Sequence, residues 1–284
     1  MSKAIILQHV AHEGPGRFIP VLRDFGIPVE VRHLYRGDEV PRFNDEMRVL
    51  IVLGGPMGVA DVGSDAYPFL APEVELLKNR IELDRPTLGI CLGAQLIAHA
   101  GGARVYKNVK MGPPGGPGQP PKPVEPEEPL PEMGWGPVMF PFPGGTEPIV
   151  FGTVDGTPMF HWHFDTFDLP KFPPPPGPPA PGPPPPTGNA LLSATRNCRN
   201  QAFRFKNRQF GFQYHLELDR PGIDALVAGN REQLIQVLGQ DGEAKIKADT
   251  DLHYSRYERV TNKIIQNFVQ FLRAYNDADV AIPV

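Results

Sequence analysis

The chain has 284 residues, a formal net charge of −4 at pH 7 and 40% hydrophobic residues, a composition that lets a globular fold bury a substantial core. The slightly acidic balance and the lack of a long basic block argue against nucleic-acid binding. The spacing of the two cysteines argues against a zinc site, and two cysteines are too few for a disulfide framework. No stretch resembles a membrane span or a signal-peptide core, so we expect a cytoplasmic protein.

The first hundred residues alternate between two kinds of segment. Short apolar runs suited to buried strands lie at residues 3–8, 29–31, 48–53 and 85–90, and helical spacing of apolar residues occurs at 14–25, 67–83 and 92–100. Continuous apolar strands separated by helices are typical of a parallel sheet that is covered on both faces. We therefore predict an α/β fold with a mainly parallel central sheet flanked by helices.

Beyond Gly102 the pattern changes to short strands and then to helices. Strand-like segments lie at 104–106, 136–140, 159–163 and 191–195, and a hairpin is expected over 201–214. Helical segments follow at 223–227, 233–238 and 255–275. We predict a single domain over residues 1–284, with extra short strands and a helical C-terminal extension over 221–280.

Proline is unusually abundant, with 36 residues that gather in two tracts. One tract lies within residues 112–131 and the other within 170–187. Both lack the strict glycine period of collagen. We interpret them as polyproline-like or mobile loop insertions, and a role as SH3-type ligands is the alternative.

Cys91 falls on the turn between a predicted strand that ends at Ile90 and a predicted helix that begins at Leu92. Gly89 and Gly93 remove Cβ atoms where strand and helix crowd each other, so a sharp turn can project the thiol into a cleft. The helix N-terminus favours a thiolate, and the N–H of Leu92 is free to bind an oxyanion. Cys91 is therefore a candidate nucleophile, and a buried core cysteine is the alternative interpretation.

Gly54 and Gly55 directly follow the apolar run at 48–53. The Lys-Ser or Lys-Thr pair of a phosphate loop is missing, so nucleotide binding is not indicated. A Gly-Gly turn at the carboxyl end of a parallel strand can aim an N–H into the crevice where such sheets bind ligands. With the N–H of Leu92 it would complete a two-donor oxyanion hole. A simple flexible turn is the alternative.

His215 and Glu217 are two residues apart at the end of a predicted strand, so their side chains can share one face. A thiol nucleophile needs a base to take its proton, and the base needs a carboxylate to orient it. Cys91, His215 and Glu217 can supply these three roles in that order.

Two further sets of residues are weaker candidates. His161 and His163 have the spacing of a metal pair, but no third ligand is evident, so we interpret them as a strand-face pair and predict no metal site. Cys198 is either a second reactive thiol or a small buried apolar residue, and the second interpretation is favoured.

Three separated blocks carry the strongest signal: Gly-Gly-Pro at 54–56, Gly-Ile-Cys-Leu-Gly-Ala-Gln at 89–95 and Gly-Phe-Gln-Tyr-His-Leu-Glu at 211–217. Together they resemble the signatures of class I (triad) glutamine amidotransferases, in particular stand-alone domains similar to the glutaminase part of GMP synthase. Residues 132–135, 162–167 and 198–203 extend the resemblance. It implies a flavodoxin-like fold and hydrolysis of the glutamine amide through a γ-glutamyl thioester, with ammonia released for a separate synthase partner and no cofactor.

The resemblance also implies roles for individual residues. Cys91 would be the nucleophile, His215 the base and acid, and Glu217 the orienting group. Gly55 and Leu92 would offer the oxyanion N–H groups. Glutamine would be held by a set of four residues: Gly54, Gln95, His163 and Asp165.

The sequence departs from the family pattern at several points. Phe164 stands where the subgroup commonly has glycine, so its ring is expected to narrow the pocket or change the acyl group that fits. Leu216 replaces a frequent proline, which we expect the backbone to tolerate. The Pro-rich tracts stand where the family has short links.

Two other functions stay open at this point. The same triad would serve a hydrolase of γ-glutamyl peptides or conjugates, since no synthase domain is fused to the chain. The third hypothesis is a catalytically idle module whose Pro-rich loops recruit a partner.

Overall fold

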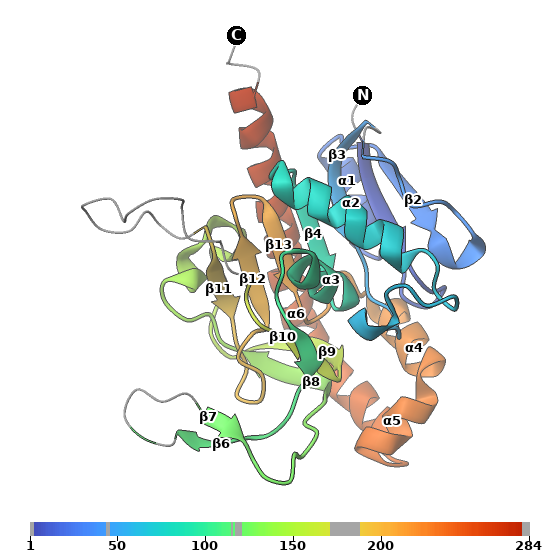
Figure 1. The fold of residues 1–284 in the computed structure, drawn as a ribbon. Helices are drawn as coiled ribbons and strands as arrows, with labels where there is room; N and C mark the ends of the chain where they lie inside the picture. The colour runs from blue at the N-terminus through green and yellow to red at the C-terminus, as the bar shows by residue number, and fades with distance from the viewer. Residues whose placement is uncertain (1–2, 44–45, 115, 117–120, 171–187, 280–284) are drawn as a thin grey trace.

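A seven-stranded sheet forms the centre of the computed structural model, in the order β11-β12-β13-β4-β3-β1-β2 (Figure 1). The structure describes residues 3–43, 46–114, 116, 121–170 and 188–279; for residues 114, 121 and 273–279 it describes the backbone alone. Five strands are parallel: β1 (Lys3–Gln8), β2 (Val29–His33), β3 (Met47–Val52), β4 (Thr87–Ile90) and β13 (Gln209–Phe212). Antiparallel β12 (Ala202–Phe205) and β11 (Ala190–Ser193) extend the sheet. The predicted fold class is confirmed.

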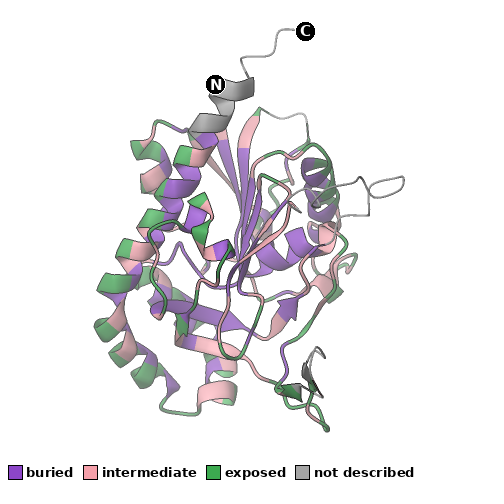
Figure 2. Ribbon diagram, turned by 90° about the vertical axis from the view of Figure 1, so that its left-hand side faces the viewer, coloured by how far each residue is buried: buried purple, intermediate pink, exposed green. Residues whose placement is uncertain are grey.

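Helices cover both faces of this sheet, and Figure 2 shows the strands buried between them. Alternate residues of β1 point to opposite sides: Ile6 packs in one core with α1 (Phe18–Asp24) and α6 (Gly242–Asp279), and Ile5 packs in the other. The second core is closed by α2 (Leu70–Glu82) and α3 (Leu92–Ala100). Burial on both faces explains why these strands are continuous apolar runs.

Shorter strands form antiparallel two-stranded sheets beside the main sheet. They pair as β8 (Glu132–Val138) with β9 (Thr157–His163), β5 (Val105–Lys107) with β10 (Asp165–Phe167), and β6 (Met111–Pro114) with β7 (Pro121–Pro123). The N–H of His215 donates to the carbonyl of Phe160 at 3.0 Å, which ties β9 to the segment after β13. This bridge brings the end of β9 to the edge of the sheet where Cys91 lies.

The remaining helices differ from the predicted ranges mainly at their ends. The chain forms α4 (Arg220–Gly229), α5 (Arg231–Leu238) and the single-turn 3₁₀ helices η1 (Leu34–Arg36), η2 (Val59–Asp61), η3 (Gly144–Thr146) and η4 (Pro148–Val150). α6 begins 13 residues before the predicted 255–275. Its first turns carry few apolar residues, and they are fixed instead by tertiary contacts, such as buried Ile246 and the bond from Trp135 Nε1 to Thr250 Oγ1 at 2.9 Å.

Two expectations concern segments that the structure describes only in part. Residues 171–187 of the second Pro-rich tract lie outside the described residues, as do 115 and 117–120 of the first. The described ends of the first tract pair as β6 and β7. Among the described helices, none has the length and apolarity needed to cross a bilayer.

Candidate active site

Cys91 occupies the sharp turn between β4 and α3, with φ of 51° and ψ of −108°, values that residues with a side chain rarely adopt. A Cβ on Gly89 would lie 2.4 Å from the carbonyl of Gly93, and a Cβ on Gly93 would lie 2.2 Å from the carbonyl oxygen of Val52. Both contacts are with backbone, which cannot move aside easily. The two glycines therefore let α3 begin directly behind the strand and present the thiol at the sheet edge.

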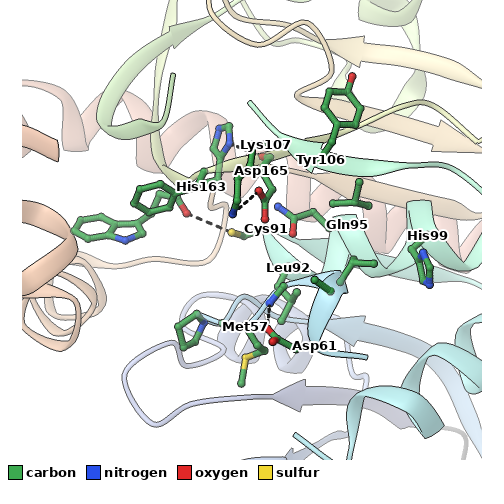
Figure 3. Close-up of a pocket in the computed structure, with 18 of the residues that line it drawn as sticks. Met57, Asp61, Cys91, Leu92, Gln95, His99, Tyr106, Lys107, His163 and Asp165 are labelled. Atoms are coloured by element: carbon green, nitrogen blue, oxygen red, sulfur yellow. Dashed lines mark hydrogen bonds and ion pairs between the residues drawn. The ribbon is translucent and has the colours of Figure 1, made fainter. Parts of the chain in front are cut away.

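The Cys91 thiol is nearly buried, with 6% of the residue exposed. Its Sγ donates to the carbonyl of Trp162 at 3.5 Å (Figure 3). It also accepts from Gln213 Nε2 at 3.6 Å. Burial raises the pKa of Cys91, and nearby His215 opposes this rise only in part. Desolvation thus opposes the expected preference of the helix N-terminus for a thiolate, and the thiol needs a base to lose its proton.

His215 and Glu217 form a buried pair beside Cys91. His215 Nδ1 donates to Glu217 Oε1 at 2.7 Å. Burial alone would lower the pKa of His215, but the charge of Glu217, the nearby Cys91 thiol and the bond to Glu217 raise this pKa well above its usual value. His215 Nε2 is buried, and no partner among the described residues meets hydrogen-bond geometry with it. This nitrogen is therefore available to exchange a proton with the thiol.

Neighbouring elements hold this pair in place. Tyr257 on α6 donates its hydroxyl to the carbonyl of His215 at 3.1 Å, and the N–H of Arg17 donates to the carbonyl of Glu217 at 2.9 Å. The N–H of Leu216 donates to Glu217 Oε2 at 2.9 Å. A proline at 216 has no N–H to donate, so the leucine at this position adds a bond that orients the carboxylate.

Most of the predicted site residues line one cavity of about 1080 Å³ (Figure 3): Gly55, Cys91, Leu92, Gln95, His163 and Asp165. Phe164 also lines it. Gly54, predicted to bind substrate, is instead behind the wall, where its carbonyl is bonded to His9 at 2.9 Å. The structure therefore brings the predicted residues together, with Gly54, His215 and Glu217 buried or set back outside the cavity lining.

Several of the predicted substrate-binding groups already have protein partners. Gln95 Nε2 donates to Gln213 Oε1 at 3.2 Å, and Asp165 pairs with Lys107 at 2.8 Å. Both ring nitrogens of His163 face protein oxygens, namely the carbonyl of Asp165 at 2.9 Å and Glu132 Oε2 at 3.1 Å. His163 thus shapes the cavity wall and has no free nitrogen to offer a ligand in this arrangement.

The backbone N–H groups of Gly55 and Leu92 are suited to bind an oxyanion. Within the described ranges, no acceptor is assigned to the N–H of Gly55. Leu92 is the first residue of α3, a position whose N–H has no partner inside the helix. The side chain of Leu92 also lies close to Gly55, since a Cβ built on Gly55 would come within 3.3 Å of it. Gly55 and Leu92 are therefore neighbours in the cavity that Cys91 also lines.

Glu13 is a cavity residue that the sequence analysis missed. It is 6% exposed, and its Oε2 occupies the space above Gly54, where a Cβ would come within 2.2 Å of this oxygen and 3.3 Å of His215 Cε1. Burial raises the pKa of Glu13 to about 7, and His215 opposes the rise in part. The sequence holds one indication of this position: Glu13 follows closely after β1, and ligands bind at the carboxyl ends of parallel strands.

Glu13→Gln is expected to remove a pH dependence of stability. Because the pKa of Glu13 is about 7 in the folded protein and about 4.5 ordinarily, the folded state binds more protons between these values. The free energy of unfolding then falls as the pH rises through this window, by about 3 kcal/mol at most, and stays low above it. Glutamine mimics the protonated acid, so the variant should be more stable than wild type above about pH 7 and equal to it below about pH 4.

Urea unfolding at several pH values measures this difference directly. Glu75→Gln is the matched control, because Glu75 is exposed on α2 and its carboxylate pairs with the exposed Lys78 at 2.6 Å. A constant stability difference between wild type and Glu13→Gln across the window would contradict the prediction.

A second polar cluster joins Glu132 to the two histidines that the sequence singled out. One ligand atom from each of Glu132, His161 and His163 lies within 4.8 Å of the others, so the third ligand missing from the sequence is Glu132 on the paired strand. Thr195 donates to Glu132 Oε1 at 2.7 Å, and Gln201 donates to Glu132 Oε2. These donors bind both oxygens of the Glu132 carboxylate, and the cluster joins β8 to β9.

Cys198 is 2% exposed and lies 3.1 Å from the hydroxyl of Thr166. Burial raises its pKa to about 12. A thiol in this state is a poor nucleophile, which agrees with its interpretation as a small buried residue.

Comparison with known proteins supports the motif-based resemblance. Residues 18–133 match the family described as Glutamine amidotransferase class-I. The predicted resemblance is confirmed. The matched part of the chain includes Gly55, Cys91 and Gln95 and ends before His215.

Other similarities span nearly the whole chain. The glutamine amidotransferase-like protein YfeJ of Salmonella typhimurium is 23% identical over 258 residues, which cover 90% of this chain and 91% of YfeJ. A glutamine amidotransferase from Thermotoga maritima has a TM-score of 0.70 at 21% identity, covering 95% of this chain and 97% of the other. A Thermoplasma acidophilum protein described as a GMP synthase component has a TM-score of 0.55 at 20% identity, covering 98% of both chains. The two structural similarities establish a shared fold.

Proposed function

We propose that the protein hydrolyses the side-chain amide of glutamine through a γ-glutamyl thioester on Cys91 and releases ammonia for an acceptor. One observation carries the proposal. A buried histidine, fixed by Glu217 through a 2.7 Å bond, has its free nitrogen beside a thiol that opens into a cavity. This is the arrangement that acyl transfer by a cysteine nucleophile requires.

The reaction then follows from the roles of these groups. Cys91 gives its proton to His215 Nε2 and attacks the γ-carbonyl carbon, and the resulting oxyanion accepts hydrogen bonds from the N–H groups of Gly55 and Leu92. When the C–N bond breaks, His215 returns the proton to the leaving nitrogen, which departs as ammonia. His215 next takes a proton from water, the hydroxide attacks the thioester, and glutamate leaves as the proton returns to Cys91 Sγ.

The charges of the site support this sequence of proton transfers. The raised pKa of Cys91 keeps the thiol protonated until it meets a base, and Glu217 stabilises the imidazolium that forms on His215. Because both groups are buried, this stabilisation acts in a medium that screens charge weakly.

Labelling with a diazoketone analogue of glutamine tests the proposal. One equivalent of label is expected on Cys91, together with loss of glutamine-dependent ammonia release. Cys198 is an internal control, because its thiol is buried with a pKa of about 12. Absence of label on Cys91, with no ammonia released by the unlabelled protein, would support the idle binding module instead.

The size of the cavity favours a second substrate class, γ-glutamyl peptides or conjugates. A volume of about 1080 Å³ is at the upper end of what drug-sized ligands occupy and exceeds the needs of glutamine. Besides Cys91, the lining includes Arg104 and Lys107 as well as Gln233 and Gln236 of α5. A panel of γ-glutamyl dipeptides is expected to show higher kcat/KM than glutamine if this class is the natural one.

The wider organisation of the protein is also part of this proposal. We assign one domain to residues 1–284, with loop insertions at 112–131 and 170–187 and a helical extension over 221–280. A separate synthase would receive the ammonia, in a cytoplasmic setting. Phe164, which lines the cavity, would limit the acyl groups that fit.

A further inference from the structure

His9 lies at the carboxyl end of β1, beside the glycine turn that follows β3. Its Nδ1 is 2.9 Å from the carbonyl oxygen of Gly54, and its Nε2 is 3.0 Å from a carboxylate oxygen of Glu73 on α2. His9 is 1% exposed and Glu73 is fully buried. The proton transfers proposed above use neither residue, so this buried pair next to the site calls for its own explanation.

The partners of His9 determine its protonation. A backbone carbonyl only accepts hydrogen bonds, and an ionised carboxylate likewise only accepts them. Both ring nitrogens of His9 must therefore donate, which makes the ring an imidazolium with Glu73 as its counter-charge. Burial alone would lower the pKa of His9, but the charge of Glu73 and the bonds to Glu73 and Gly54 raise this pKa above its ordinary value.

The bond to Gly54 also fixes the direction of the next N–H. The carbonyl of Gly54 and the N–H of Gly55 belong to one peptide group, and the described cis peptide bonds precede Pro126 and Pro143 only, so this group is trans. In a trans peptide the C=O and the N–H point in opposite directions. With its carbonyl held by His9 behind the wall, the peptide directs the N–H of Gly55 toward the cavity, which Gly55 lines and Gly54 does not.

The turn has no other described bond that would hold this peptide. Glycine adopts many backbone conformations, so an unrestrained Gly-Gly peptide can rotate at little cost. Rotation by half a turn would place the carbonyl of Gly54 where the oxyanion has to bind. A buried ion pair is weak evidence for stability by itself, because desolvation offsets much of its attraction. The contact of His9 with Gly54 indicates another role for the His9–Glu73 pair, which is to hold the Gly54–Gly55 peptide in one orientation.

We propose that His9 and Glu73 are positioning residues that lock the Gly54–Gly55 peptide with the N–H of Gly55 directed at the oxyanion. The inference rests on the proposed function, since it assigns this N–H to the transition state. Glu73 keeps His9 doubly protonated, and His9 holds the peptide. The oxyanion hole is then formed before substrate binds.

A matched pair of variants tests the proposal. In the Glu73→Gln background, which leaves no unpaired buried carboxylate, His9→Asn is compared with His9→Leu. Asparagine and leucine have nearly the same shape, but only asparagine can donate to the Gly54 carbonyl. For the leucine variant we expect kcat for glutamine to fall about 10²- to 10³-fold, the effect of losing one oxyanion donor, with KM changed only a few-fold. The asparagine variant should recover most of the loss.

Alkylation of Cys91 by iodoacetamide is the second readout, because displacement at a saturated carbon forms no oxyanion. Its rate should stay within about twofold in both variants, whereas loss of an oxyanion donor changes amide turnover by orders of magnitude. Equal kcat in the two variants would overturn the proposal, as would a parallel loss of alkylation and turnover. If wild type itself released no ammonia from glutamine, the proposed function would fail instead.

Nuclear magnetic resonance of wild-type protein with ¹⁵N-labelled histidine gives a test that needs no stable leucine variant. Both ring nitrogens of His9, assigned through His9→Asn, should carry protons. An unprotonated Nδ1 could not donate to Gly54 and would refute the positioning role.

Discussion

Cys91→Ala is expected to lower kcat for glutamine by about 10⁶-fold, the effect seen when a nucleophile that acts within a triad is removed. The fold should survive, because alanine keeps the Cβ and the hydrogen bonds of the thiol with described residues are weak, at 3.5 and 3.6 Å. The backbone at this position has φ of 51°, a strain that cysteine and alanine bear alike. Ammonia release in a coupled assay measures the effect.

Cys198→Ala is the matched control for this substitution. It removes the other free thiol of the chain, which lies beside Thr166 away from the cavity lining. Turnover should be that of wild type. Unchanged ammonia release in Cys91→Ala would contradict both enzyme hypotheses, the amidotransferase and the γ-glutamyl hydrolase, since they share the nucleophile.

Glu217→Gln is expected to lower kcat by about 10⁴-fold while KM changes little. The amide has the same shape as the carboxylate but lacks the charge that stabilises the imidazolium of His215. Loss of that charge removes the main influence that raises the pKa of His215, so desolvation by burial lowers it. The pH–rate profile should move to lower pH together with the loss in rate.

Asp219→Asn is the control, because Asp219 is a neighbouring acid with a structural task. Its Oδ1 accepts from the N–H of Gly222 at 2.8 Å and caps α4, so the variant should lose no more than about 1 kcal/mol of stability and keep its turnover. Wild-type kcat in Glu217→Gln would remove Glu217 from the proposed triad.

Local patterns were sufficient for the parts of the site that depend on residues close in sequence. The spacing of Gly89, Cys91 and Gly93 predicts the strand–turn–helix geometry, because backbone crowding at that turn is a local property. The two-residue spacing of His215 and Glu217 likewise predicts that they share a face, and their side chains are 2.7 Å apart.

Contacts across the chain were not predictable in the same way. Glu132 is separated from His163 by 31 residues, and only the antiparallel pairing of β8 with β9 sets them opposite each other. The early start of α6 depends on contacts such as that between Trp135 and Thr250, since the helix's first turns lack a strong apolar period. The pKa of Cys91 likewise depends on tertiary structure, because burial of the thiol raises it.

The sequence by itself determined the α/β class, the nucleophile elbow and the resemblance to class-I glutamine amidotransferases, because apolar periodicity and short motifs act over a few residues. Only the tertiary structure decided that Glu13 enters the cavity, that Gly54 lies behind its wall, and that His9 and Glu73 hold the glycine turn. His9 is 45 positions from Gly54 and 64 positions from Glu73 in the sequence, yet it contacts both. Parallel strands bring their carboxyl ends to one edge of a sheet, and that geometry has no signature in any single stretch of sequence.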